Sequence, residues 1–144
     1  MRSPLLATKW FAPPIRPDAV RRPRLVQRLD QGVRVGHVVV AAPAGFGKST
    51  LVAQWAQATR MPVAWLSLEE DDQEPLRFLS YLVAALTTVE GEALAGVERS
   101  LRSSQPAPPE AIATYLVNAL ARADAPIALI LDDQHLAAGD ATNE

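Results

Sequence analysis

Apolar and polar positions follow two different periods along this chain of 144 residues. Runs of apolar residues occur at 38–42, 63–68 and 127–131, each next to turn-forming or charged residues. Such runs predict buried strands, and the run at 38–42 is apolar throughout, as expected for a strand covered on both faces. Between the runs, apolar residues recur at helical spacing. The alternation of strands and helices predicts an α/β fold with a parallel sheet.

Four stretches have helical spacing, and their ends are marked by proline and glycine. Gly32 should end the first helix, while Pro75 and Pro109 suit the first turns of the third and fourth. Residues 90–109 carry several Gly, Ser and Pro residues, which predict a frayed short helix and a loop. The predicted helices are 25–32, 48–59, 75–86 and 109–123.

The apolar positions of these helices predict which side chains form the core. Trp55 is expected to be a core residue, and Tyr115 a core residue with its hydroxyl in water. The expected inner faces comprise Leu51, Val52, Trp55 and Ala58; Leu76, Leu79, Val83 and Leu86; and Ile112, Tyr115, Leu116, Ala119 and Leu120.

Two polar or proline-rich stretches are expected to lie outside the core. Residues 1–23 contain five prolines, which exclude a continuous helix and predict an extended segment. Residues 69–74 read Glu-Glu-Asp-Asp-Gln-Glu and predict a solvated acidic turn before the third helix. Neither stretch is therefore expected to contribute to the core.

The composition limits the classes of protein to which this chain can belong. Nearly half of the residues are apolar, cysteine is absent, and the net charge is −2, so a folded domain without disulfides or thiolate metal sites is expected. The first apolar run is too short for a signal peptide or a membrane span, which favours a cytoplasmic protein. Residues 2–34 carry Lys9 and seven arginines against two aspartates. This basic segment could contact nucleic acid, a phosphorylated ligand or solvent, and we favour the last two.

A phosphate-binding loop follows the first predicted strand. Residues 42–49 have the spacing of a Walker A motif, with Ala in the first position where Gly is commoner. Gly45 and Gly47 leave no Cβ between the loop and an anion, and the helix N-terminus favours phosphate. Lys48 is expected to reach the β- and γ-phosphates, and Ser49 to bind Mg²⁺. The predicted nucleotide-binding residues of this loop are Ala42, Pro43, Ala44, Gly45, Phe46, Gly47, Lys48, Ser49 and Thr50.

The last predicted strand ends in Asp132 and Asp133, as a Walker B motif does. We expect Asp132 to hold Mg²⁺ through its water shell, opposite Ser49, and Asp133 to orient or deprotonate the attacking water. Alone, two acids after a strand are a weak signal, but downstream of a phosphate-binding loop they form the expected second half of a nucleotide site. His135 could sense the γ-phosphate, and a surface or structural role fits it equally well.

Five stretches together resemble the large LuxR-type transcriptional regulators of the MalT kind, which are STAND-class P-loop ATPases. The resemblance implies a three-layer P-loop NTPase core, with Arg22 beside the adenine and ribose of ATP. It also implies a sensor array, DNA binding through a C-terminal helix-turn-helix absent from this chain, and self-association on ATP binding. The matching stretches are 9–14, 20–25, 42–51, 65–68 and 131–136.

In that class a strand with a sensor residue comes later in sequence but lies between the loop strand and the Walker B strand. The resemblance therefore implies that this chain holds a domain that is incomplete on its C-terminal side, with three parallel strands and a gap where a central strand belongs. We expect residues 1–34 to form a basic, extended segment next to the nucleotide, and 35–144 to form a partial ATPase domain from Walker A to Walker B. An alternative is that the strands pair differently and the region folds alone.

The function expected from the sequence is Mg-ATP binding as the switch module of a transcriptional activator. Slow ATP hydrolysis, with Lys48 and Asp133 as catalytic residues, is expected only if the missing C-terminal part is present. An alternative is a non-catalytic regulatory fragment with an incomplete nucleotide site. Direct DNA binding by the basic segment is a third hypothesis, and we rank it last.

Overall fold

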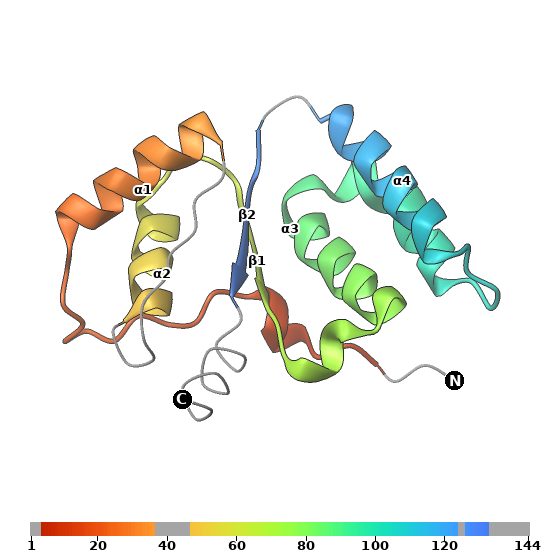
Figure 1. Ribbon diagram of the computed structural model, residues 1–144, viewed down its shortest axis with the longest axis horizontal. Coiled ribbons are helices and arrows are strands. Elements are labelled where there is room, and N and C mark those ends of the chain that lie inside the picture. The colour runs from red at the N-terminus through yellow and green to blue at the C-terminus, as the bar shows by residue number, and fades with distance from the viewer. Residues whose placement is uncertain (1–3, 37–46, 124–125, 133–144) are drawn as a thin grey trace.

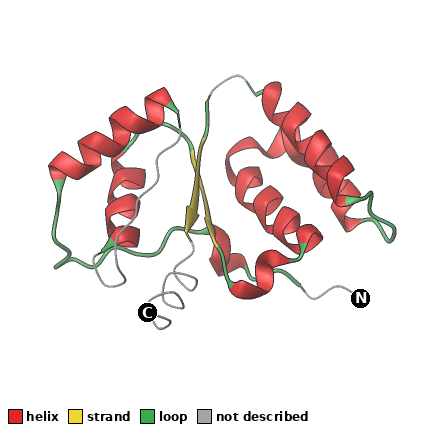
Figure 2. Ribbon diagram, viewed as in Figure 1, coloured by secondary structure: helices red, strands yellow, loops and turns green. Residues whose placement is uncertain are grey.

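A computed structural model describes residues 4–36, 47–123 and 126–132 of the chain. Helices flank both faces of a parallel pair of strands: α1 and α2 lie on one side, and α3 and α4 on the other (Figure 1; Figure 2 shows the same view by secondary structure). This arrangement confirms the α/β class. The elements in chain order are η1 (Ala7–Trp10), α1 (Pro23–Val35), α2 (Lys48–Ala58), β1 (Val63–Ser67), η2 (Glu70–Gln73), α3 (Pro75–Arg102), α4 (Pro109–Ala121) and β2 (Ala128–Asp132).

The two strands pair in parallel, with Val63 opposite Ala128 and Ser67 opposite Asp132. Because the pairing is parallel, with α3 and α4 forming the crossover between them, both strands end at the same edge of the sheet. The two predicted strands at 63–68 and 127–131 are therefore confirmed. The predicted strand at 38–42 lies outside the described residues, as does the expected gap beside it.

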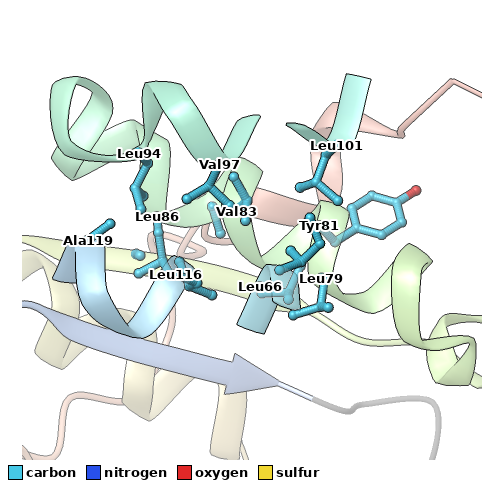
Figure 3. Close-up of a cluster of buried hydrophobic side chains, with 13 residues drawn as sticks. Leu66, Leu79, Tyr81, Val83, Leu86, Leu94, Val97, Leu101, Leu116 and Ala119 are labelled. Carbon is cyan, nitrogen blue, oxygen red and sulfur yellow. The ribbon is translucent and has the colours of Figure 1, made fainter. Parts of the chain in front are cut away.

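The main core lies between β1, α3 and α4 (Figure 3). Ala64 and Leu66 of β1 are fully buried there, and the predicted face of α3 packs on them. Fully burying an aliphatic side chain contributes about 1.5–3 kcal/mol, so these contacts are the main stabilising term of this half. The buried members of the cluster are Ala64, Leu66, Leu79, Tyr81, Val83, Ala85, Leu86, Leu94, Val97, Leu101, Ile112, Leu116 and Ala119.

The prediction of a frayed helix and loop at 90–109 is wrong for its first part. Residues 91–102 are helical and continue α3, after a break at Glu90, which has φ −135° and ψ 53°. Leu94, Val97 and Leu101 have helical spacing and are buried in the main core. Their burial outweighs the low helix propensity of the two glycines in this stretch.

α3 is long and apolar enough to cross a bilayer by length and hydropathy alone. Its 28 residues are interrupted at Glu90, and its buried face supplies most of the main core. The core helix of a globular protein passes the same test, so α3 is described here as a core helix.

The inner face of α4 agrees with the sequence except at one residue. Ile112 and Leu116 are buried, whereas Tyr115 is 48% exposed, so the prediction that Tyr115 belongs to the core is wrong. α4 packs against α3, and its buried face is centred on the 112–116–119 row. Tyr115 lies at the edge of this face, where no described element covers its ring.

The helices on the other side of the sheet depart slightly from the sequence prediction. α1 passes Gly32 and ends at Val35, because Leu29 and Val33 pack against α2 and extend the helix by tertiary contacts. In α2, Leu51 and Trp55 are buried as predicted, and Val52 is half-buried. Ala58 is exposed, and Ala53 is buried instead, next to Gln54, which donates a hydrogen bond to the backbone of the N-terminal residues at Val20.

Residues 4–22, here called the N-terminal strap, join the two halves of the molecule. The strap starts beside α3, passes the end of β1 and reaches the start of α1 (Figure 1, red to orange). Apart from the single turn η1 and a turn at residues 16–19, it has no helix or strand, as the prolines predict.

Candidate nucleotide-loop site

The end of the predicted phosphate-binding loop is described from Gly47 onward, and residues 42–46 lie outside the described part. Gly47 has φ 75° and ψ 28° and precedes the first turn of α2. This left-handed conformation is one that side chains disfavour. The first backbone N–H groups of a helix point out of its N-terminus and favour an anion there. Lys48 is the first residue of α2 and is half-buried. The local geometry therefore suits phosphate.

Ser49 and Asp132 are brought together from opposite ends of the sequence. The Ser49 hydroxyl donates a hydrogen bond of 3.0 Å to Oδ2 of Asp132, across 83 residues of chain. Ser49 lies in the first turn of α2, and Asp132 is the last residue of β2. The two side chains predicted to hold one Mg²⁺ ion thus lie next to each other.

The Arg22 guanidinium also lies at this loop. Its Nη2 would be 3.4 Å from a Cβ atom built on Gly47. Arg22 immediately precedes α1, and its backbone carbonyl accepts the N–H groups of Leu25 and Val26 at 3.1 and 3.0 Å. The start of α1 therefore fixes the backbone from which this side chain reaches the loop. A positive charge beside the N-terminus of α2 adds to its attraction for an anion.

A second contact aligns the end of the N-terminal strap with α2. Gln54 donates a hydrogen bond from Nε2 to the backbone carbonyl of Val20 at 3.1 Å. Gln54 follows Gly47 by two helical turns, and Val20 precedes Arg22 by two residues. The strap therefore runs along α2 and ends at the loop.

Other predicted site residues cannot be placed in this way. Asp133 and His135 lie outside the described residues, as do the loop residues from Ala42 to Phe46. Within the described ranges, no group of three or more His, Asp or Glu side chains gathers that could hold a metal by itself. Ser49 and Asp132 would share a cation with nucleotide oxygens and waters, which Mg²⁺ usually retains, so two protein groups suffice.

A buried charge cluster lies at the other end of the strap, and the sequence did not predict it. Lys9 and Asp72 are 4% and 3% exposed, and their side chains form an ion pair. Asp72 also accepts the Glu69 backbone N–H at 2.9 Å and the Arg77 Nε at 3.0 Å. The Lys9 ammonium lies 4.4 Å from the centre of the Tyr81 ring. The prediction that residues 69–74 form a solvated turn is therefore wrong for Asp72.

The pKa of Asp72 reflects two opposing effects. Burial works to raise it, but the hydrogen bonds from Lys9, the Glu69 backbone and Arg77 outweigh burial and hold the pKa below its ordinary value. The hydrogen bond to Asp72 in turn raises the pKa of Arg77. Asp72 is therefore ionised at neutral pH, with a cation on either side.

Neither sequence spacing nor composition marks Lys9 and Asp72 as partners, because they are 63 residues apart. In sequence, Lys9 belongs to a basic segment and Asp72 to an acidic run, where most members are solvated. Only the packing of η1 against β1 and α3 brings the two side chains together.

A pocket of about 250 Å³ opens between the strap, α2 and β1. Trp10 and Trp65 supply aromatic walls, while Gln57 and Thr88 supply polar groups. Gly47, Ser49 and Asp132 do not line it, so it is separate from the loop site. The lining residues are Trp10, Phe11, Ala12, Pro13, Ala53, Ala56, Gln57, Val63, Trp65 and Thr88.

Comparison with known proteins agrees with the sequence resemblance. Over 140 residues, 97% of this chain, it is 36% identical to the HTH-type transcriptional regulator MalT of Yersinia enterocolitica. It is 34% identical over the same length to MalT of Yersinia pestis. The chain is a relative of the MalT-type transcriptional regulators. No protein-family model matches it.

The chain spans 15% of the length of these MalT relatives. The shared region covers nearly all of the chain, so it includes the α2 N-terminus, the end of β2 and the N-terminal strap. The resemblance predicted from the short motifs is thus confirmed over 97% of the chain.

Proposed function

We propose that this chain is the Mg-ATP-binding switch module of a MalT-type transcriptional regulator. The observation that carries the proposal is the hydrogen bond between Ser49 and Asp132, next to a left-handed Gly47 at a helix N-terminus. A left-handed glycine at a helix N-terminus and a pair of hard oxygen ligands are what the two halves of a nucleotide-Mg²⁺ site require. The MalT-type relatives supply the regulatory context.

In this proposal the chain's own groups divide the work. Lys48 and the first N–H groups of α2 bind the phosphates, and Arg22 adds positive charge at the same loop. Ser49 binds Mg²⁺, Asp132 holds its water shell, and the ion neutralises phosphate charge. Arg22 at the phosphate end is a different placement from the adenine and ribose contact that the resemblance implied, because its guanidinium lies against Gly47.

The wider role follows the MalT relatives. ATP binding would favour an active state, and slow hydrolysis positioned by Asp133 would reset it. DNA binding would belong to a helix-turn-helix elsewhere in the regulator, and self-association would accompany ATP binding. Such a regulator would act in the cytoplasm. The second candidate is a regulatory fragment that binds no nucleotide.

Calorimetry with ATP, with and without Mg²⁺, tests the proposal on this chain. We expect Mg-dependent binding, abolished by Lys48→Ala and unchanged by Arg60→Ala, a matched loss of an exposed cation beyond the other end of α2. In Asp132→Asn, the ratio of affinities with and without Mg²⁺ should fall. Full affinity in a folded Lys48→Ala variant would refute the loop assignment, and absence of binding to the folded wild-type chain would favour the non-catalytic fragment.

A further inference from the structure

The N-terminal strap is fixed at its first end by the buried cluster. Lys9 carries one of the two buried charged side chains among the described residues, and Asp72 is the other. Because an unpaired ammonium is unfavourable to bury, Lys9 stays with Asp72 while η1 stays in place. Two further contacts support the anchor: the Leu6 N–H donates to the Tyr81 hydroxyl at 3.0 Å, and the Trp10 and Tyr81 rings lie 6.1 Å apart.

The strap is fixed at its second end on α2. The Val20 carbonyl is held by Gln54, and the Arg22 guanidinium lies against Gly47. Seven residues of α-helix span about 10 Å, so these two contacts align the end of the strap with α2 up to the loop. The two ends of the strap thus lie on different halves of the molecule.

The segment between the anchors is stiff. Pro13, Pro14 and Pro17 each fix one backbone dihedral angle, and the residue before each proline is restricted too. A turn follows, in which the Ala19 N–H donates to the Arg16 carbonyl at 3.0 Å. Proline-rich segments behave as semi-rigid spacers, so a displacement of one end is passed to the other rather than absorbed.

From these contacts we infer that Lys9 is a positioning residue for Arg22: the buried Lys9–Asp72 pair, acting through the proline-stiffened strap, holds the Arg22 guanidinium at the nucleotide loop. The inference rests on the proposed function for its effect on ATP, and on the strap contacts alone for its effect on structure. The acidic turn and α3 are thereby coupled to the phosphate end of the site. Loss of the pair would lower affinity for ATP without altering a ligand-contacting residue.

A double-mutant cycle tests the coupling by calorimetry with Mg-ATP. We expect Lys9→Met to weaken binding about tenfold, the size expected for losing one hydrogen bond to a charged group. Since Lys9 would act only through Arg22, Lys9→Met should cause no further loss in an Arg22→Ala background. Arg102→Gln, which removes an exposed ion pair with Glu98 on α3, is the matched control and should bind as the wild type does.

A second variant avoids the buried cluster. Pro14 and Pro17 are exposed, so replacing both by glycine removes stiffness while both anchors stay intact. We expect this variant to weaken ATP binding by several-fold, again with no further loss once Arg22 is alanine. Pro108→Gly, in the loop before α4, is the matched control for the added freedom of the unfolded chain.

Hydrogen exchange separates this inference from the proposed function. The Ala19 amide is hydrogen-bonded, lies between the two anchors without belonging to either, and reports the order of the strap without a bound nucleotide. Lys9→Met should speed its exchange about tenfold, while α4 amides keep their wild-type rates. If the wild-type chain binds no ATP, the proposed function fails, and the exchange result alone decides whether the strap is coupled. Unchanged Ala19 exchange, or additive losses in the cycle, would overturn the inference.

Discussion

Replacing Asp72 by alanine should destabilise the protein more than any other single removal of a charged side chain among the described residues. The change removes the carboxylate that pairs with Lys9 and accepts hydrogen bonds from Glu69 and Arg77. Lys9, which is 4% exposed, would remain buried without its main partner unless η1 moved away.

The expected loss in the free energy of unfolding depends on the contacts that Lys9 keeps when Asp72 is removed. Breaking a buried ion pair by removing one partner typically costs about 3–5 kcal/mol. Lys9 would retain the Glu69 carboxylate at 3.7 Å and the face of the Tyr81 ring at 4.4 Å. These contacts partly compensate the charge, so the lower end, about 3 kcal/mol, is expected. For a domain of this size, that loss lowers the Tm by about 6–12 °C.

Urea unfolding followed by circular dichroism measures this loss, with Asp71→Ala as the matched control. Asp71 is the preceding residue and is exposed. Its removal should therefore change the free energy of unfolding by less than about 0.5 kcal/mol. The double variant Lys9→Met/Asp72→Leu removes both charges and should recover much of the lost stability. Equal losses for Asp72→Ala and Asp71→Ala would show that Lys9 is not enclosed as described.

The same pair gives the stability a pH dependence. The folded-state pKa of Asp72 lies below the ordinary value of 3.8, so its stabilisation is fully present above the unfolded pKa and is lost as pH falls through the folded pKa. The stability difference between the wild type and Asp72→Ala should stay constant from pH 7 to about 5 and shrink below about 4. A difference that instead grows on acidification would contradict the cause given for this shift.

The remaining predictions concern the loop and the core. Gly47→Ala should cost about 1–2 kcal/mol, because a Cβ atom disfavours the left-handed conformation. The added Cβ atom would meet the Arg22 guanidinium at an ordinary van der Waals distance of 3.4 Å, so the loss comes from the backbone, and urea unfolding measures it. Ile112→Ala should cost about 2–5 kcal/mol, measured by urea unfolding. Val117→Ala, at a position 65% exposed, should cost almost nothing, and similar losses for the two would refute the described face of α4. Asp133→Asn is expected to preserve ATP binding and abolish hydrolysis, measured as phosphate release in the full regulator.

Much of the architecture could be predicted from local sequence patterns. The strands at 63–68 and 127–131 are apolar runs, and α2 and α4 begin where a loop glycine or a proline predicts. The motif spacing also named Ser49 and Asp132 as partners, and the structure places them 3.0 Å apart. These features could be predicted because residue type and spacing largely determine strand burial, helix starts and the left-handed conformation of a glycine such as Gly47.

Tertiary packing decided the rest. Glycines at 91 and 96 suggested a frayed helix, yet residues 91–102 are helical because Leu94, Val97 and Leu101 are buried by other elements. Tyr115 has the spacing of a core residue but lies where no described element covers it.

The buried Lys9–Asp72 pair shows most clearly what the sequence determined and what only the tertiary structure decided. The sequence by itself determined that Lys9 lies in a proline-rich segment with an excess of basic residues, and Asp72 in an acidic run. Only the fold decided that η1 packs beside η2 and α3, which removes both charges from water and makes each the partner that the other requires. Lys9 and Asp72 are 63 residues apart, so their pairing depends on how the elements between them pack. Local sequence patterns do not specify that packing.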